Sequence, residues 1–294
     1  MRKKGARSFE REMRLNHRKQ KYCYGFSLVE MVIVLAILGA LLFIAFRGIG
    51  SLSEAAQKAK AMSSLRTIVN AYRQYMKDMG HPIRWSELSA VAETGSMDFD
   101  VTLIAAVLAK GGYLTDVEAW AWDFDYRVRK YEKEEGVMPT KICDIRRDAN
   151  GKIISAKIDI SFRGQRGFPI SVCAVVAADS CTNDDFFKND SEIPIAYSRG
   201  LCGWNMAPGT WADSTINRDL GGVFGRKGGF IAFLDGHVEW YNNLGTGNQC
   251  ALKKYDTNAM TNKIYEAIPK GGIVMRTNSF VLSWKGGGES CDRF

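Results

Sequence analysis

Residues 26–46 read FSLVEMVIVLAILGALLFIAF, an apolar run that contains one charged residue, Glu30. At 1.5 Å per residue, a helix of this length spans about 31 Å, close to the thickness of a bilayer core. The run exceeds the roughly 7–15 apolar residues of a secretory signal, and no small-x-small cleavage pattern follows it. The stretch predicts a helix over residues 26–46 that lies in a membrane or in the apolar core of a helical bundle.

The positive charge of the chain lies ahead of this helix. The net charge is +8, but residues 1–25 alone carry nine basic and two acidic side chains. A basic segment before an apolar helix is typical of an end that stays in the cytoplasm, so the rest of the chain is expected on the other side of the membrane. That remainder is almost neutral. Its charge gives no support for nucleic-acid binding.

Glu30 has two interpretations. A carboxylate in an apolar helix costs several kcal/mol unless it is paired, protonated or close to the membrane surface. It is therefore either a charge tolerated at the membrane edge or a charge that awaits a partner. Cleavage between Gly25 and Phe26 would create an α-amino group one helical turn away. In a stack of such helices, the amine of one subunit would meet Glu30 of a neighbour and fix the axial register.

The hexapeptide Gly25-Phe26-Ser27-Leu28-Val29-Glu30 resembles the class III signal of type IV prepilins and type II secretion pseudopilins. The resemblance implies that a prepilin peptidase cuts after Gly25 and methylates the new N-terminal Phe26. It implies that Glu30 corresponds to the glutamate at the family's fifth mature position. It also implies these partners: the peptidase, other pilin or pseudopilin subunits, an inner-membrane assembly platform and the lipid bilayer.

Residues 47–80 are predicted to continue the helix with one apolar face. Apolar side chains recur at three- and four-residue steps, and polar residues fill the other face. The stripe consists of Leu52, Ala55, Ala59, Met62, Leu65, Val69, Tyr72, Met76 and Met79. Gly80, followed by His81-Pro82, is a stop signal. Many pilins have a proline near mature position 22, where this chain has Arg47, and Gly48 and Gly50 are expected to loosen the helix there instead.

Residues 81–294 are predicted to form a globular head of α+β class, with an antiparallel sheet packed on the amphipathic helix. The expected elements are a helix at 99–108, a hairpin at 140–161 around Asn150-Gly151, a strand at 170–178, a hairpin at 230–241 and a last strand at 273–284. In the first hairpin, Ile154, Ala156, Ile158 and Ile160 are expected inside, and Ser155, Lys157 and Asp159 outside. Residues 199–229 and 242–263 are expected to be glycine-rich loops.

The hairpin at 230–241 is predicted with a two-residue loop, Asp235-Gly236. That loop pairs Phe233 with Val238 and Ile231 with Trp240, which places these four apolar side chains on one face. The segment GGFIAFLDGHVEWY is similar to the C-terminal signature of prepilin-type H-X9-DG proteins. The histidine of that signature corresponds to Gly225 here, so no role of that histidine transfers.

Three groups of residues are candidate head sites, each with a structural alternative. Asp235, His237 and Glu239 suggest a metal or acid–base cluster, but a turn and a solvent-facing strand explain them better. An acidic loop could supply oxygen ligands to calcium, but it lacks EF-hand spacing, and a solvated loop explains it better. Its acidic residues are Asp179, Asp184, Asp185 and Asp190. A group of aromatic residues could form a platform for carbohydrate stacking, but packing in the core explains it better. The group is Trp120, Trp122, Phe124 and Tyr126. No cofactor or catalytic residue is expected.

Six of the seven cysteines follow the apolar helix. An even set on one side of a membrane segment predicts disulfides in an oxidising compartment, with connectivity left open. The candidates are Cys143, Cys173, Cys181, Cys202, Cys250 and Cys291. A structural zinc site is not expected, because no CxxC occurs.

Three functional hypotheses follow from the sequence. The favoured one is a structural subunit of a type IV pilus or a type II secretion pseudopilus, without enzymatic activity. Such a subunit would lie in the bacterial inner membrane with its head in the periplasm, and then enter a filament or reach the cell surface. The second is a membrane-anchored binding protein or enzyme that carries a class III signal. The third is a plain single-span anchored protein that keeps its leader.

Overall fold

The computed structural model describes residues 28–92, 100–135, 138–163, 169–187, 189–201, 209–214, 221–246, 249–257, 259–276 and 279–281. The chain divides into two compact units, Met1–Ala55 and Ala56–Phe294. Helix α2 is assigned to Leu28–Met79 and contributes residues to both units. The described residues of the first unit are all helical.

From residue 56 onward, α2 buries one face in the second unit. Leu65, Val69, Tyr72 and Met76 are fully buried, as the three- and four-residue spacing predicts. The helix is followed by Gly80, whose φ of 74° favours glycine and confirms the predicted stop signal. The prediction is wrong at the ends of the apolar stripe, where the side chains are exposed: Ala55, Ala59 and Met79.

Helix α4 (Val101–Gly111) is the most deeply buried of the shorter helices. It confirms the helix predicted at 99–108, with both ends shifted; Phe99 lies outside the described residues. The Asp100 carboxylate accepts a 2.9 Å hydrogen bond from the N–H of Thr102, and Gly112 ends the helix with φ 79°. The remaining helices are α3 (Trp85–Val91), α5 (Tyr126–Glu135), α6 (Ile160–Arg163), α7 (Asn183–Phe187) and the 3-10 turns η1 (Val117–Ala119), η2 (Gly225–Lys227) and η4 (Ile264–Glu266).

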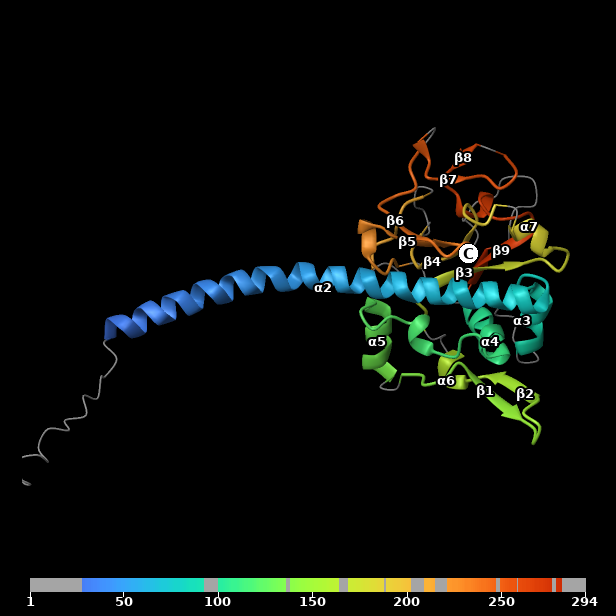
Figure 1. Ribbon diagram of the computed structural model, residues 1–294, viewed down its shortest axis with the longest axis horizontal. Helices are drawn as coiled ribbons and strands as arrows, with labels where there is room; N and C mark the ends of the chain where they lie inside the picture. The colour runs from blue at the N-terminus through green and yellow to red at the C-terminus, as the bar shows by residue number, and fades with distance from the viewer. Residues whose placement is uncertain are drawn as a thin grey trace, which may run out of the picture. The chain divides into compact units, whose positions relative to one another are not determined.

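A six-stranded antiparallel sheet forms the centre of the second unit (Figure 1), which confirms the predicted α+β class. The strand order is β10-β9-β3-β4-β5-β6. The strands are β3 (Val172–Ala177), β4 (Pro194–Ser198), β5 (Gly229–Phe233), β6 (Val238–Tyr241), β9 (Gly272–Arg276) and β10 (Ser279–Val281). The strand predicted at 170–178 is β3. The single strand predicted at 273–284 is wrong, because β9 and β10 are separate strands that pair antiparallel.

The central strands β3, β4 and β5 are buried on both faces. Along β3, Ala174 and Val176 belong to one apolar cluster, and Cys173 and Val175 to another, as alternation in a strand requires. The first cluster includes side chains of α2, α3 and α4. The second cluster also contains side chains from outside the sheet. Leu244 and Leu252 come from the predicted loop 242–263, and Ile264, Ala267 and Ile268 come from the segment that follows it. That loop contains the short pair β7 (Leu252–Lys253) and β8 (Met260–Thr261).

Burial on both faces explains why the predicted register of the β5–β6 hairpin is wrong. Phe230 pairs with Trp240 and Ala232 with Val238, one residue away from the predicted register. The loop has three residues, 234–236, since the N–H of Phe233 donates to His237 O at 3.0 Å and closes the hairpin. The prediction assumed one solvated face. Because both faces of β5 are buried, the apolar pattern does not fix the register.

The β1–β2 hairpin is confirmed at Cys143–Arg147 and Ile153–Ile158, with Gly151 at φ 82° in the turn. Its predicted alternation is partly wrong. Ile154 is 69% exposed, because the register shifts beside it, between Arg146 and Arg147. Asp159, expected outside, is buried and accepts a 2.8 Å hydrogen bond from the N–H of Ser161 at the start of α6. Ile160 belongs to α6 and not to the strand.

Candidate functional site

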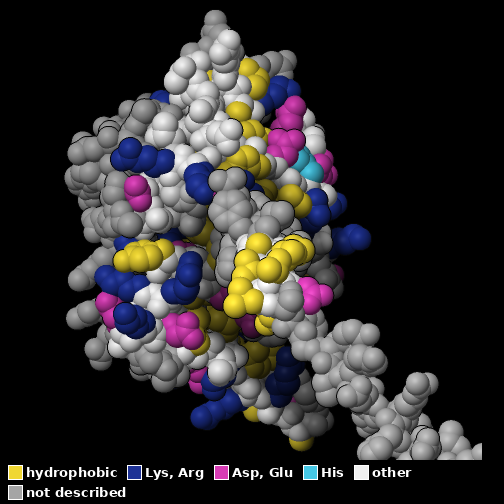
Figure 2. Space-filling view, turned by 90° about the vertical axis from the view of Figure 1, so that its left-hand side faces the viewer, with side chains coloured by type: hydrophobic (Ala, Val, Ile, Leu, Met, Phe, Trp, Pro, Cys, Tyr) yellow, Lys and Arg dark blue, Asp and Glu magenta, His cyan; other side chains and the backbone are white. Residues whose placement is uncertain are grey.

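The first turns of α2 carry large apolar side chains that are exposed among the residues that the structure describes. Nine large apolar residues between Leu28 and Leu38 are between 44% and 81% exposed, and hydrophobic side chains of this kind are yellow in Figure 2. Burying one side chain of this size is worth about 1.5–3 kcal/mol. A contiguous apolar helix surface of this kind marks an interaction site with protein or lipid.

Glu30 lies in the first turn of α2 and is exposed. The predicted cleavage and methylation residues, Gly25 and Phe26, lie outside the described residues. Within the described part of the chain, no helix combines the length and the apolar composition that crossing a membrane requires.

The second unit holds α2 at several points along residues 58–76. Near the start of this stretch, the Lys58 ammonium lies 4.1 Å from the centre of the Trp240 ring, and Lys60 Nζ lies 3.1 Å from Asp123 Oδ1. Farther along, Arg73 Nη1 donates to the carbonyl of Asp235 at 2.7 Å. These contacts join this part of the helix to the β5–β6 hairpin and to the segment before α5.

Two tyrosines of α2 face the interior near its C-terminal end. Burial raises the pKa of Tyr72, whose side chain is fully enclosed. Burial and a hydrogen bond to Glu87 raise the pKa of Tyr75. Both phenols are therefore neutral at physiological pH and serve packing rather than acid–base chemistry.

The residues of the β5–β6 turn are occupied by local contacts. The Asp235 carboxylate accepts a hydrogen bond from the N–H of His237 at 2.9 Å and lies 2.5 Å from His237 Nδ1. The His237 ring stacks on Phe233 with centroids 4.2 Å apart. Glu239 contacts the Tyr241 hydroxyl and is exposed. This arrangement matches the turn interpretation of Asp235, His237 and Glu239.

The aromatic group at 120–126 is mostly core. Trp120 and Trp122 are fully buried, and Trp122 stacks on Phe124 with ring centroids 5.6 Å apart. Phe124 lies 5.7 Å from Phe224, within a cluster of rings. Tyr126 is 48% exposed. Core packing, and not a flat stacking platform, describes the two tryptophans.

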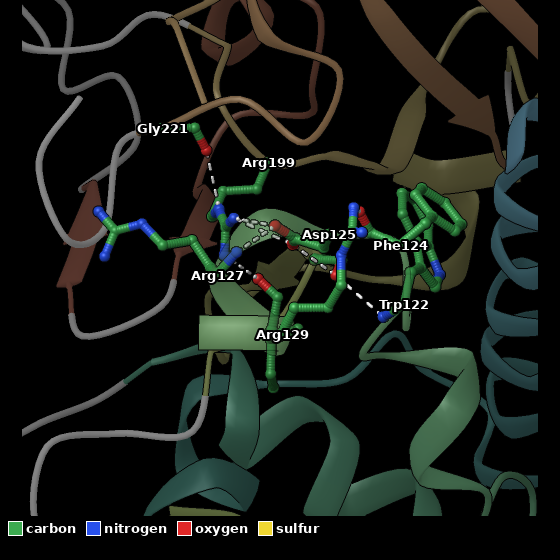
Figure 3. A network of polar contacts seen from close by, with 9 residues as sticks. Trp122, Phe124, Asp125, Arg127, Arg129, Arg199 and Gly221 are labelled. Carbon is green, nitrogen blue, oxygen red and sulfur yellow. Dashed lines mark hydrogen bonds and ion pairs between the residues drawn. The ribbon is translucent and has the colours of Figure 1, made fainter. Parts of the chain in front are cut away.

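A buried ion pair between Asp125 and Arg199 joins four segments of the second unit (Figure 3), and the sequence did not predict it. Arg199 Nη2 donates to both Asp125 oxygens at 2.9 Å, and its other nitrogens donate to the carbonyls of Gly221 and Ile170. Asp125 also accepts from Ser171 Oγ at 2.7 Å and from the N–H of Arg127 at 3.0 Å.

This network is structural in character. Both charged side chains are at most 2% exposed, and each is hydrogen-bonded on several sides, which buried charges require. One signal was present in the sequence, since Asp125 precedes α5 and its position suits an N-cap. Arg199 offers no such signal, because β4, which places it, was not predicted.

The calcium candidates do not converge. Asp179 accepts from the N–H and hydroxyl of Ser86, at 3.0 and 2.6 Å, and these bonds lower the pKa of Asp179. Asp185 accepts from the N–H and hydroxyl of Thr182 at 2.8 Å, while Asp184 is exposed in the same helix. Among the residues that the structure describes, no three His, Cys, Asp or Glu side chains gather closely enough to hold a metal ion.

The predicted disulfides find no support in the described ranges. No disulfide joins any two of the described cysteines, Cys143, Cys173, Cys181 and Cys250. Cys202 and Cys291 lie outside the described residues. Burial raises the pKa of Cys143 to about 11 and also raises the pKa of Cys181. Both thiols are buried and protonated at neutral pH.

Comparisons with known proteins bear on the N-terminal segment. Residues 20–46 match the family model described as the prokaryotic N-terminal methylation motif. This motif is typical of type IV prepilin-like proteins. No curated protein and no solved structure matches the chain. The resemblance of the Asp235-Gly236 hairpin to H-X9-DG proteins stays a prediction.

Proposed function

We propose that the protein is a structural subunit of a type IV pilus or a type II secretion pseudopilus. The observation that carries the proposal is the methylation motif at residues 20–46, which includes the exposed apolar side chains of residues 28–38. In this proposal, residues 26–46 lie first in the membrane and then in the filament core, and residues 47–80 continue the helix onto the head. The head serves as a structural module and not as an enzyme.

The mechanism starts in the bacterial inner membrane. The basic leader, residues 1–25, keeps the N-terminus in the cytoplasm while the head crosses to the periplasm. A prepilin peptidase removes the leader and methylates Phe26. The helix then leaves the bilayer for a bundle of identical or related helices, where contacts with neighbouring apolar side chains replace contacts with lipid.

Processing is the first test. The mass of the intact protein, extracted from membranes of cells with active prepilin peptidase, should correspond to a chain that begins at methylated Phe26. A matched sample from cells without the peptidase should retain residues 1–25. A leader retained in the presence of active peptidase would contradict the proposal and favour a plain membrane anchor.

Glu30 supplies the second test, because its carboxylate is proposed to meet the N-terminal amine of a neighbouring subunit. The Glu30→Gln variant should be cleaved normally but should be depleted in the sheared filament fraction. Leu35→Ile, a conservative change in the same helix, serves as the control and should assemble normally. Normal assembly of Glu30→Gln would refute the register role and favour a surface protein that merely carries the signal.

A further inference from the structure

A groove of about 620 Å³ runs beside strand β2 in the second unit. The end of α3 forms one wall, Lys110 at the end of α4 contributes to it, and five consecutive residues of β2 form the other wall. The lining residues are Ala90, Val91, Ala92, Lys110 and residues 153–157. Side chains of consecutive strand residues alternate between faces, so a groove that touches all five follows the edge of β2 rather than one face.

Among the residues that the structure describes, this edge of β2 has no strand beside it. In the part of the chain described, β2 pairs with β1 alone, in a two-stranded sheet. The N–H of Asp159 donates to Ile142 O at 2.8 Å, and antiparallel bonds recur at every second residue. The N–H and C=O of Ala156 therefore point away from β1. Among the described residues, no other segment forms a backbone hydrogen bond with Ala156.

The groove carries two positive charges and an apolar contact. Neither Lys110 nor Lys157 forms an ion pair with a described residue, whereas several other lysines of this unit do. Ile154, in the same strand, is 69% exposed. An open strand edge flanked by two cations and an isoleucine fits an extended segment with carboxylates and apolar side chains in alternation.

We propose that this groove binds an extended acidic segment of another polypeptide as an added strand on β2. Backbone hydrogen bonds to Ala156 provide the affinity, and ion pairs with Lys110 and Lys157 select acidic sequences. A second copy of β2 is a poor occupant, because it would bring another Lys157 to the same edge. The groove lies wholly in the second unit, so its test is independent of N-terminal processing.

The test measures fluorescence anisotropy of a labelled peptide, acetyl-(Val-Glu)4-amide, with the full-length protein in detergent micelles. Saturable binding is expected. The variant Lys110→Glu/Lys157→Glu should weaken it by about tenfold or more, since two attractive contacts become repulsive. The same variant should gain affinity for acetyl-(Val-Lys)4-amide. Lys227→Glu changes the charge as much as either groove reversal alone, lies on η2 outside the groove, and should leave binding unchanged.

The backbone contribution is tested by Ala156→Pro. Proline removes the outward N–H of residue 156 but no bond to β1, so the hairpin should still form. Peptide binding should fall at least tenfold, while unfolding of the head stays nearly unchanged. If Ala156→Pro unfolds the head, the charge reversal decides the proposal. In that case Ile145→Val, on the paired strand, shows whether a change in β1–β2 packing alone affects peptide binding.

Three results would overturn the proposal. One is the absence of saturable binding, and another is binding that neither the charge reversal nor Ala156→Pro changes. The third is binding that appears only after Glu93→Ser/Asp98→Ser, because this would assign the groove to residues 93–99 of the same chain. Equal binding of the Val-Glu and Val-Lys peptides by the parent protein would likewise overturn it, because the two lysines would then not select acidic sequences.

Discussion

Helix α2 contains two stretches that differ in what covers them. Residues 28–38 are apolar on every side of the helix except at Glu30, and their large apolar side chains are exposed. Residues 61–76 are apolar on one face, and that face is buried in the core of the second unit. The later stretch obtains its stability from the chain itself. No described side chain buries the earlier stretch to the same degree, and in the proposed function a membrane or a helical bundle covers it.

The largest expected effect is on the stability of the head, and it should leave the processing of the N-terminal segment unchanged. Asp125→Ala leaves Arg199 buried without its counter-charge, which costs about 3–5 kcal/mol in the free energy of unfolding. Denaturant unfolding, followed by fluorescence of the buried tryptophans in micelles, measures the loss. Cleavage after Gly25 should continue, because the motif lies outside the second unit.

The control for this variant is Asp144→Ala. Asp144 pairs with Lys141 at the surface, where both side chains are more than half exposed, so its loss should cost less than about 1 kcal/mol. If the two aspartate variants unfold alike, the buried pair does not hold the head together. If Asp125→Ala abolishes cleavage as well, the two stretches of α2 are not independent.

A matched pair of leucines tests the comparison within one helix. Leu65 is fully buried and Leu35 is 62% exposed. Leu65→Ala should lower the free energy of unfolding by about 2–5 kcal/mol through the cavity it leaves. Leu35→Ala should change it by less than about 0.5 kcal/mol. An equal loss for both in denaturant unfolding would show that the chain itself packs residues 28–38.

The accuracy of the sequence predictions follows the same division. The methylation motif at residues 20–46 was predictable because the basic leader, the Gly25-Phe26 junction and Glu30 lie close together in the sequence. The apolar stripe of α2 from Leu65 to Met76 was predictable because one face of the helix is buried and the other is exposed to solvent. The predicted β5–β6 register was wrong because β5 is buried on both faces, so its own residues carry no polar side that marks the outside.

Other features of the head depend on contacts that no local pattern contains. The Asp125–Arg199 pair joins residues 74 positions apart and needs β4, which begins at Pro194 and carries no polar alternation. The prediction that Asp159 faces outward was wrong because Asp159 lies at the start of the short helix α6 and not in the strand before it. The β2 groove became visible only when α3 and α4 were placed beside a strand edge.

A smaller effect is expected at the contact between α2 and the β5–β6 turn. Arg73→Ala removes a part-buried hydrogen bond from a charged donor to Asp235 O, which should cost about 1–2 kcal/mol of unfolding free energy. Arg66→Ala, an exposed arginine on the same helix, should cost less than about 0.5 kcal/mol. Amide hydrogen exchange should quicken at residues 234–237 in the Arg73 variant. Unchanged exchange there would show that the turn does not depend on the helix.

The smallest expected effect is a pH dependence confined to the head, which would sharpen the contrast with residues 28–38. Burial raises the pKa of Asp159, but hydrogen bonds from Ser161 and the charge of Lys141 outweigh it, so the net pKa lies below the usual value. A lowered pKa in the folded state means that this carboxylate stabilises the head at pH above about 4. That contribution is lost as the pH falls through the lower folded value.

Asp159→Asn should therefore reduce stability at pH 7 and flatten the decline of unfolding free energy between about pH 4 and pH 2. Ser161→Ala removes one of the bonds that lower the pKa, and its profile should lie between those of the variant and the parent. Denaturant unfolding in micelles at several pH values provides both profiles. Identical acid limbs in parent and Asp159→Asn would assign the acid sensitivity of the head to other carboxylates, of which Glu266, whose pKa is also lowered, is the next to test.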